Sequence, residues 1–102
     1  MYRRVKTEGR ALRKFPLVLR FLKAQDILES RVGYIIRKPT GKAVLRNAIR
    51  RILRETFRLH YKQLNLPVWV VFEVSDRVRE ITRTQLHEAA NHLWQSLVKE
   101  AV

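Results

Sequence analysis

The segment KAVLRNAIRRILRETFR, residues 42–58, holds five arginines and one lysine in seventeen positions. Placed on a helix at about 100° per residue, its side chains separate into two sets. One arc collects Leu45, Ile49, Ile52, Thr56 and His60. The opposite flank collects Arg46, Asn47, Arg50, Arg51, Arg54 and Arg58. The pattern predicts an amphipathic helix over residues 42–64, with one flank for a core and a cationic flank that faces outward.

Strands are predicted on both sides of this helix in the sequence. PLVLRFLKA, residues 16–24, and RVGYIIR, residues 31–37, are rich in apolar, β-branched and aromatic residues, and the polar stretch between them favours a hairpin. PVWVVFEV, residues 67–74, is almost continuously apolar, which is typical of a strand buried on both faces. Residues 1–8 predict a short helical segment that ends at Gly9.

The last part of the chain predicts a second long helix. Thr82 and Gln85 have the T-x-x-Q spacing of a capping box, and the helix is expected to end near Lys99. Its apolar residues recur at helical spacing: Leu86, Ala89, Ala90, Leu93 and Leu97. The predicted elements follow in this order: a short helix, two strands, the basic helix, a strand and a final helix. This order predicts a single α+β domain, residues 1–102, in which one sheet packs against helices.

The charge of the chain is strongly one-sided. Twenty-two Lys and Arg residues against nine Asp and Glu give a formal net charge of +13. Such an excess repels itself unless a polyanion neutralises it, so the expected partners are nucleic acid or an anionic membrane. Arginine predominates, and its planar fork suits phosphate. Membrane binding would need the apolar flank of the basic helix, which the sheet requires, so we expect no membrane partner.

Several other classes of chemistry lack their motifs. There is no cysteine, and no apolar run has the length of a membrane span or the form of a signal peptide, which together favour a cytoplasmic protein. His87 and His92 are five residues apart, whereas a zinc pair on a helix needs four. The acids are scattered, without a partner histidine. We therefore expect no catalytic residue, no metal ligand and no cofactor bound by the protein alone.

Residues 31–58 resemble the signature region of the bacterial ribonuclease P protein subunit. The resemblance is carried by Arg31 and Gly33 in a strand, by GKAV at residues 41–44, and by Arg-Asn at residues 46–47 followed by further basic residues, as in the family's RNR motif. It implies a left-handed βαβ crossover whose long helix docks onto the catalytic RNA of ribonuclease P. In that family the RNA, with Mg²⁺, cuts the 5′ leader from precursor tRNA, and the protein assists.

The resemblance implies two sites. The RNA-binding face would consist of Arg46, Asn47, Arg50, Arg51, Arg54, Arg58, Lys38 and Lys42. A cleft between the first helix and the sheet would hold the single-stranded leader, with Phe15, Phe21, Tyr34 and Arg37 as candidates. A place in the core is the alternative for the three aromatic residues. YRRV before Gly9 matches only the end of the family's first helix, which would shorten one wall of the cleft.

The implied partners are therefore ribonuclease P RNA and precursor tRNA, with Mg²⁺ acting together with the RNA. Two alternatives stay open at this point. The charge alone would equally suit a ribosomal or other general RNA-binding protein, and a nuclease that acts without RNA is the second alternative. The sequence also leaves open whether the protein associates weakly with itself.

Overall fold

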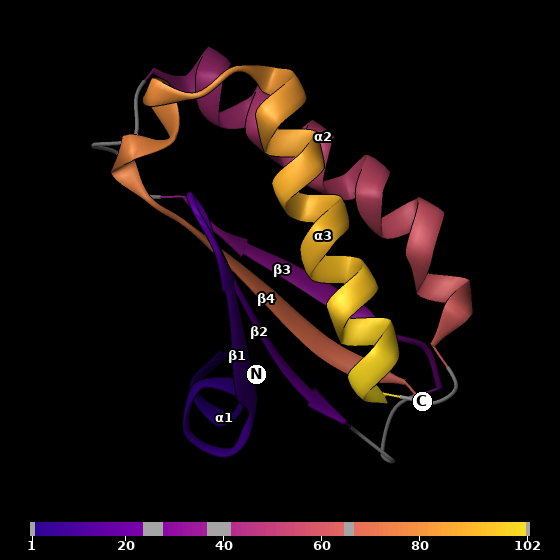
Figure 1. Ribbon diagram of the computed structural model, residues 1–102. Coiled ribbons are helices and arrows are strands. Elements are labelled where there is room, and N and C mark those ends of the chain that lie inside the picture. The colour runs from indigo at the N-terminus through magenta and orange to yellow at the C-terminus, as the bar shows by residue number, and fades with distance from the viewer. Residues whose placement is uncertain (1, 24–27, 37–41, 65–66, 102) are drawn as a thin grey trace.

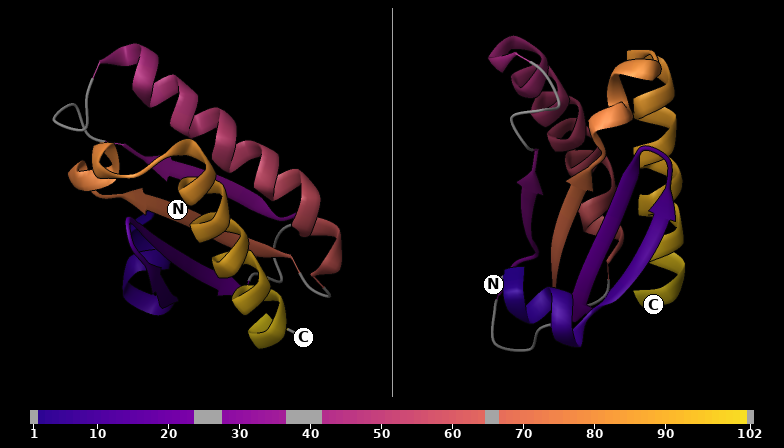
Figure 2. Two further views of the ribbon diagram at one scale, coloured as in Figure 1. Left: turned by 45° about the horizontal axis from the view of Figure 1, so that its top comes forward. Right: turned by 90° about the vertical axis from the view of Figure 1, so that its left-hand side faces the viewer.

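The computed structural model describes residues 2–23, 28–36, 42–64 and 67–101. In chain order the elements are α1 (Tyr2–Glu8), β1 (Arg10–Lys14), β2 (Leu17–Lys23), β3 (Arg31–Ile35), α2 (Ala43–His60), the 3-10 turn η2 (Tyr61–Gln63), β4 (Val68–Val74), the 3-10 turn η3 (Asp76–Glu80) and α3 (Arg83–Ala101). Figure 1 shows one sheet with the two long helices along one side. The short helix α1 packs on β2 and β4 from the other side (Figure 2). The predicted α+β class is confirmed.

The sheet has the strand order β1-β2-β4-β3. β2 pairs antiparallel with both β1 and β4, whereas β3 and β4 run parallel. Helix α2 is therefore the crossover of a β3-α2-β4 unit. In the right-hand view of Figure 2, β3 and β4 both point upward, β4 lies to the right of β3, and α2 passes behind them. This arrangement is a left-handed crossover, as the resemblance implied, and it is rare among parallel strand pairs.

The predicted hairpin between the first two apolar strands is wrong. β2 and β3 do not pair, and each lies on one side of β4. The reason is burial: in β4 the consecutive residues Val70 and Val71 are 0% and 2% exposed, so this strand is covered on both faces and occupies the centre. β1 was not predicted at all, because its sequence RALRK is polar and most of its side chains are exposed. It forms the edge of the sheet by pairing with β2.

The main core lies between the sheet and the two long helices. Residues opposite one another in paired strands share a face, so Leu19 of β2 and Tyr34 of β3 lie on the same side as Phe72 of β4. Trp94 of α3 meets Phe72 edge-on at 5.6 Å between ring centroids, and neither side chain is exposed. Each large apolar side chain buried in this way stabilises the fold by about 1.5–3 kcal/mol.

A buried hydrogen-bond chain joins α2 to α3. Thr56 is 0% exposed, and its hydroxyl donates to the carbonyl oxygen of Leu53 at 2.7 Å while it accepts from the indole nitrogen of Trp94 at 3.0 Å. One turn later the His60 ring and the Asn91 side-chain oxygen lie 3.1 Å apart. The C-terminal half of α2 is therefore fixed against α3 by polar contacts as well as by packing.

The ends of the long helices follow the sequence closely. The predicted capping box is confirmed: the backbone N–H of Gln85 donates to the Thr82 hydroxyl at 3.1 Å, and the N–H of Thr82 donates to the Gln85 side-chain oxygen at 2.8 Å. α3 continues to Ala101, two residues past its predicted end. The regular part of α2 ends at His60, and η2 takes the chain on to Gln63, close to the predicted end of the basic helix.

Helix α1 covers part of the other face of the sheet. Its Val5 is 1% exposed, and the Arg4 guanidinium lies 5.3 Å from the centre of the Trp69 ring of β4. The chain turns out of α1 at Gly9, where an added Cβ would collide with the carbonyl oxygens of Phe21 and Val5. Glycine is therefore required here by close backbone approach.

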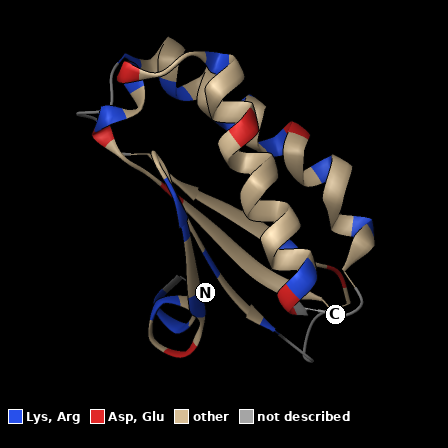
Figure 3. Ribbon diagram, in the orientation of Figure 1, with Lys and Arg blue, Asp and Glu red and all other residues tan. Residues whose placement is uncertain are grey.

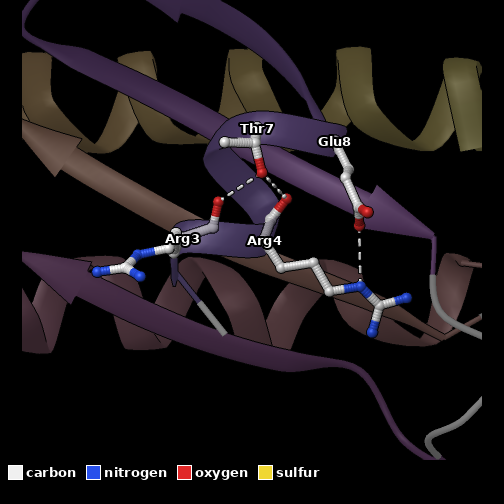
Figure 4. A network of polar contacts seen from close by, with 4 residues as sticks. All are labelled: Arg3, Arg4, Thr7 and Glu8. Atoms are coloured by element: carbon white, nitrogen blue, oxygen red, sulfur yellow. Dashed lines mark hydrogen bonds and ion pairs between the residues drawn. The ribbon is translucent and has the colours of Figure 1, made fainter.

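Side-chain contacts also stabilise this short helix from within. The Thr7 hydroxyl donates to the carbonyl oxygen of Arg3 at 2.9 Å and lies 3.4 Å from that of Arg4, and the Arg4 Nε donates to the Glu8 carboxylate at 3.0 Å (Figure 4). Both partners of the ion pair are about half exposed, so it contributes little to stability. Burial of Val5 holds α1 on the sheet.

Candidate nucleic-acid interface

Helix α2 has the two flanks that the sequence predicted. Its buried residues are Ile49, Ile52, Leu53 and Thr56, and all four face the core. Leu53, which is 0% exposed, was not part of the predicted arc. On the outer flank the side chains of Asn47, Arg51, Arg54 and Arg58 are exposed, and those of Arg46 and Arg50 are half-buried. Lys42, at the N-cap, is exposed as well. Figure 3 shows the basic residues along this helix. Lys38, which was predicted for the same face, lies outside the described residues.

The cationic flank has almost no acidic neighbours. Within the described ranges, none of the five arginines of α2 forms an ion pair with a carboxylate. Arg50 donates to the Asn47 side-chain oxygen at 3.0 Å, and the Arg46 Nε is shielded from solvent without a hydrogen-bond partner in the part of the chain that the structure describes. Glu55, the acid within the helix, lies 3.9 Å from His87 of α3 instead. The guanidinium groups therefore keep donors available for an anion.

The row of arginines winds around the helix as it proceeds. Residues four apart are displaced by about 40° around the axis at each step, so Arg58 is turned by about 120° from Arg46. Arg54 and Arg58 consequently reach the side of α2 that faces β3. There they line a hollow of about 750 Å³ between α2, η2 and the start of β3. The cationic flank thus ends at a concave site.

Aromatic side chains form one wall of this hollow. Phe57 and Tyr61 stack at 5.1 Å between ring centroids, and Tyr34 stacks on the buried Phe72 at 6.4 Å. The Tyr34 hydroxyl is shielded from solvent and has no hydrogen-bond partner among the described residues. Burial raises the pKa of Tyr34 above its usual value, although the nearby charges of Arg54 and Arg58 oppose this. The phenol is therefore neutral and retains its proton near pH 7.

The four residues predicted for a leader cleft do not come together. Phe21 is 3% exposed and belongs to the core, so its core alternative is confirmed. Tyr34 shares a face with Phe72, under the long helices, so the prediction that it lines a cleft with α1 is wrong. Phe15 is 51% exposed beside β1 and β2, with the Arg77 guanidinium 5.3 Å from its ring centre. Arg37 lies outside the described residues.

The face of the sheet that carries α1 has a shallow groove made of other residues. It holds about 470 Å³ and is lined by Pro16, Val18, Ile35, Glu73, Val74, Ser75, Asp76 and Arg77. Beside it, Arg20 donates to the Glu73 carboxylate at 3.1 Å. These positions were missed by sequence reasoning. The alternation of β2, in which Val18 and Arg20 face away from Leu17 and Leu19, was the available signal.

Of the residues that line the large hollow, only Tyr34, Arg54 and Arg58 were predicted as site residues, and Phe57, Tyr61 and Lys62 are among those that were missed. Lys62 continues the four-residue spacing of Arg54 and Arg58, and Phe57 is four residues from Tyr61. Both spacings were visible in the sequence. They carried no meaning until the fold placed them beside Tyr34, which comes more than twenty positions earlier in the chain.

Neither a metal centre nor a membrane-spanning helix is present in the part of the chain that the structure describes. Residues 2–23, 28–36, 42–64 and 67–101 contain no group of three or more His, Asp or Glu side chains placed to hold a metal. No helix within the same ranges is long and apolar enough to cross a bilayer.

The fold and surface define a class: small basic α+β proteins in which a cationic helix forms a left-handed crossover between parallel strands.

Comparison with known proteins identifies the family within that class. The family model of ribonuclease P matches residues 1–98. The chain therefore belongs to the ribonuclease P protein family, as the resemblance had suggested.

Individual relatives agree with the family model, and each bears the name ribonuclease P protein component. The protein from Roseiflexus castenholzii is 38% identical over 96 residues, which cover 92% of this chain and 77% of the relative. The protein from Acinetobacter baylyi is 34% identical over 87 residues, with 84% of this chain and 66% of the relative covered. The protein from a Marinomonas species is 34% identical over 79 residues, which cover 76% of this chain and 59% of the relative. The chain thus spans less than two thirds of the length of the last two relatives.

Solved structures show the same fold. The RNase P protein of Staphylococcus aureus superposes with a TM-score of 0.85 at 24% identity, covering 94% of this chain and 87% of that one. The RNase P protein of Thermotoga maritima gives a TM-score of 0.76 at 23% identity, covering 93% and 89%. At these identities the likeness supports the architecture of the sheet and helices.

Proposed function

We propose that this chain is the protein component of a ribonuclease P. It binds the catalytic RNA through the outer flank of α2 and assists the Mg²⁺-dependent removal of the 5′ leader from precursor tRNA in the cytoplasm. The observation that carries the proposal is the set of arginines on the crossover helix of this family's fold that have no acidic partner among the residues that the structure describes. The RNA would carry out the hydrolysis, and the protein would contribute counter-charge and positioning.

Counter-charge is a physical form of assistance. Two folded RNA segments that must approach each other repel through their phosphates, and arginines fixed on a rigid helix reduce that repulsion without the entropy cost of ordering ions. α2 is suited to this because its inner flank is fixed by Leu53 and Thr56. A surface that meets six to ten phosphates loses about 10³ to 10⁵ in affinity between about 50 and 200 mM salt.

The test is reconstitution with ribonuclease P RNA at a Mg²⁺ concentration too low for the RNA alone. The chain should restore cleavage of precursor tRNA at the leader junction, and the protein without RNA should cleave nothing. Binding to the RNA without restored cleavage would instead indicate a general RNA-binding protein. Cleavage by the RNA-free protein would contradict the proposed division of labour.

A charge-reversed variant tests the interface itself. Arg50→Glu with Arg51→Glu should weaken binding to ribonuclease P RNA by about 100-fold or more and reduce its salt dependence, because several phosphate contacts are lost together. The matched control reverses two charges on the far edge of the sheet, Arg13→Glu with Lys14→Glu in β1, where both side chains are exposed. Equal losses in the two variants would show that only net charge matters, and would reject the α2 interface.

A further inference from the structure

The hollow at the C-terminal end of α2 has features that docking onto an RNA surface does not require. A helix face that meets phosphates can be convex, whereas this site is concave and holds about 750 Å³. That volume lies within the range of about 300–1,000 Å³ that is typical of sites for small organic groups. The hollow therefore suits a discrete chemical group.

One wall of the hollow is cationic. Arg54, Arg58 and Lys62 all line it, and all three side chains are exposed. Glu29 is the acidic residue among the lining side chains, and it is exposed as well. Among the described lining residues the balance is three cations against one anion, so the complementary ligand is anionic. A phosphate group meets this requirement, and arginine binds it through paired N–H donors.

The other wall is aromatic and rigid. Tyr61 is 37% exposed and stacks on Phe57 with 22° between the ring planes. Phe57 in turn packs on Trp94 at 5.6 Å between ring centroids. Trp94 is 0% exposed, and its indole N–H donates a hydrogen bond to the Thr56 hydroxyl. The wall is thus held by the core before any ligand arrives. Preorganised aromatic faces bind nucleobases by stacking, with little loss of conformational entropy.

A third aromatic residue, Tyr34, lines the hollow. Its ring stacks on the buried Phe72 at 6.4 Å between ring centroids, so it too is fixed by the core. Its hydroxyl is shielded from solvent, so the ligand would meet the aromatic side chains and the cations instead of this oxygen. Aromatic faces beside cations suit a nucleotide, whereas a lipid tail would leave the cations unused.

We propose that this hollow binds one unpaired nucleotide of an RNA, with the base on the aromatic wall and the phosphate on Arg54, Arg58 and Lys62. The inference rests on the proposed RNA-binding function and adds a defined contact to it. It also assigns roles to Tyr61 and Lys62, which the arginine row does not include. An extruded single-stranded base is the form in which RNA offers both a ring face and a free edge.

The experiment uses the full chain and, as a probe, a short single-stranded oligoribonucleotide with one 2-aminopurine, whose fluorescence falls when the base stacks. Arg58→Gln removes one cation of the proposed phosphate site and should weaken binding by about threefold to tenfold, the range that one net hydrogen bond represents. Tyr61→Ala should abolish most of the fluorescence change.

The matched control is Arg13→Gln in β1, which removes the same charge far from the hollow and should change affinity less than twofold. An unchanged fluorescence response in Tyr61→Ala would overturn the proposal, as would equal losses in Arg13→Gln and Arg58→Gln, or an oligonucleotide that does not bind. These outcomes are separable from failure of the proposed function. That function is tested by Arg50→Glu with Arg51→Glu on ribonuclease P RNA, and neither residue lines the hollow.

Discussion

The two flanks of α2 differ in what holds them in place. On the inner flank Ile49, Leu53 and Thr56 are 0–2% exposed and are fixed by neighbours in the sheet and in α3. On the outer flank the arginines have no acidic partner among the described residues, and they repel one another at four-residue spacing. One helix thus carries a flank that stabilises the fold and a flank that costs stability. The cost is understandable if the outer flank is selected for binding.

The largest expected loss of stability comes from a substitution in the inner flank. Leu53→Ala removes a side chain that is 0% exposed and leaves a cavity, so the free energy of unfolding should fall by about 2–5 kcal/mol. The matched control is Leu59→Ala on the same helix, where the leucine is 68% exposed and the loss should stay within about 0.5 kcal/mol. Urea denaturation followed by circular dichroism measures both. Similar losses at the two positions would contradict the assignment of the buried flank.

A smaller effect follows from the polar contact within the same flank. Thr56→Val keeps the shape of the side chain but leaves the Trp94 indole N–H without its acceptor, so the free energy of unfolding should fall by about 1–3 kcal/mol. Thr56→Ser retains the hydroxyl and should recover most of that part of the loss. Urea denaturation of the three proteins, followed by circular dichroism, measures the change. If valine were as stable as threonine, this hydrogen bond would not fix α2 to α3.

The sequence was sufficient to predict these flanks, and insufficient to predict the sheet. Helical periodicity is local: the spacing of Leu45, Ile49 and Ile52 specifies the buried arc whatever surrounds the helix. Strand partners are chosen globally. β2 and β3 are neighbours in sequence, yet the fully buried β4 separates them, because the most apolar strand gains most from the centre of the sheet. The central place of β4 becomes visible only in the three-dimensional structure.

The candidate site also has a part that could be predicted from the sequence and a part that could not. The arginine row was predictable because it depends on one helix. The places of Phe21 and Tyr34 depend on strand register, since a shift of one residue moves a side chain to the other face. The register sets Phe21 opposite Val70 and Tyr34 beside Phe72, so both face the long helices instead of α1. The hollow beside Tyr34 combines β3 with the end of α2, and no local pattern contains both.

At the N-terminus of α2, fold stability and RNA binding favour different residues at the same position. Lys42 is the N-cap, its side chain makes no capping bond, and its charge lies at the positive end of the helix dipole. Lys42→Ser should therefore raise the free energy of unfolding by about 0.5–1.5 kcal/mol, since serine can cap the exposed N–H groups. The same change should weaken binding to ribonuclease P RNA by removing one cation. Lower stability, or tighter RNA binding, would argue against a functional reason for lysine at this cap.

The smallest expected effect on folding is at Arg51, which is exposed on the outer flank. Arg51→Gln keeps a long helix-forming side chain and removes only a charge that neighbouring arginines repel. The free energy of unfolding should therefore change by no more than about 0.5 kcal/mol. Binding to ribonuclease P RNA should weaken, and the slope of log affinity against log salt should become shallower by about 0.7–0.9, the contribution of one phosphate contact. Filter binding over a salt series gives both quantities. A change in stability without a change in slope would place Arg51 with the inner flank, and the contrast between the two sides of α2 would no longer hold at that position.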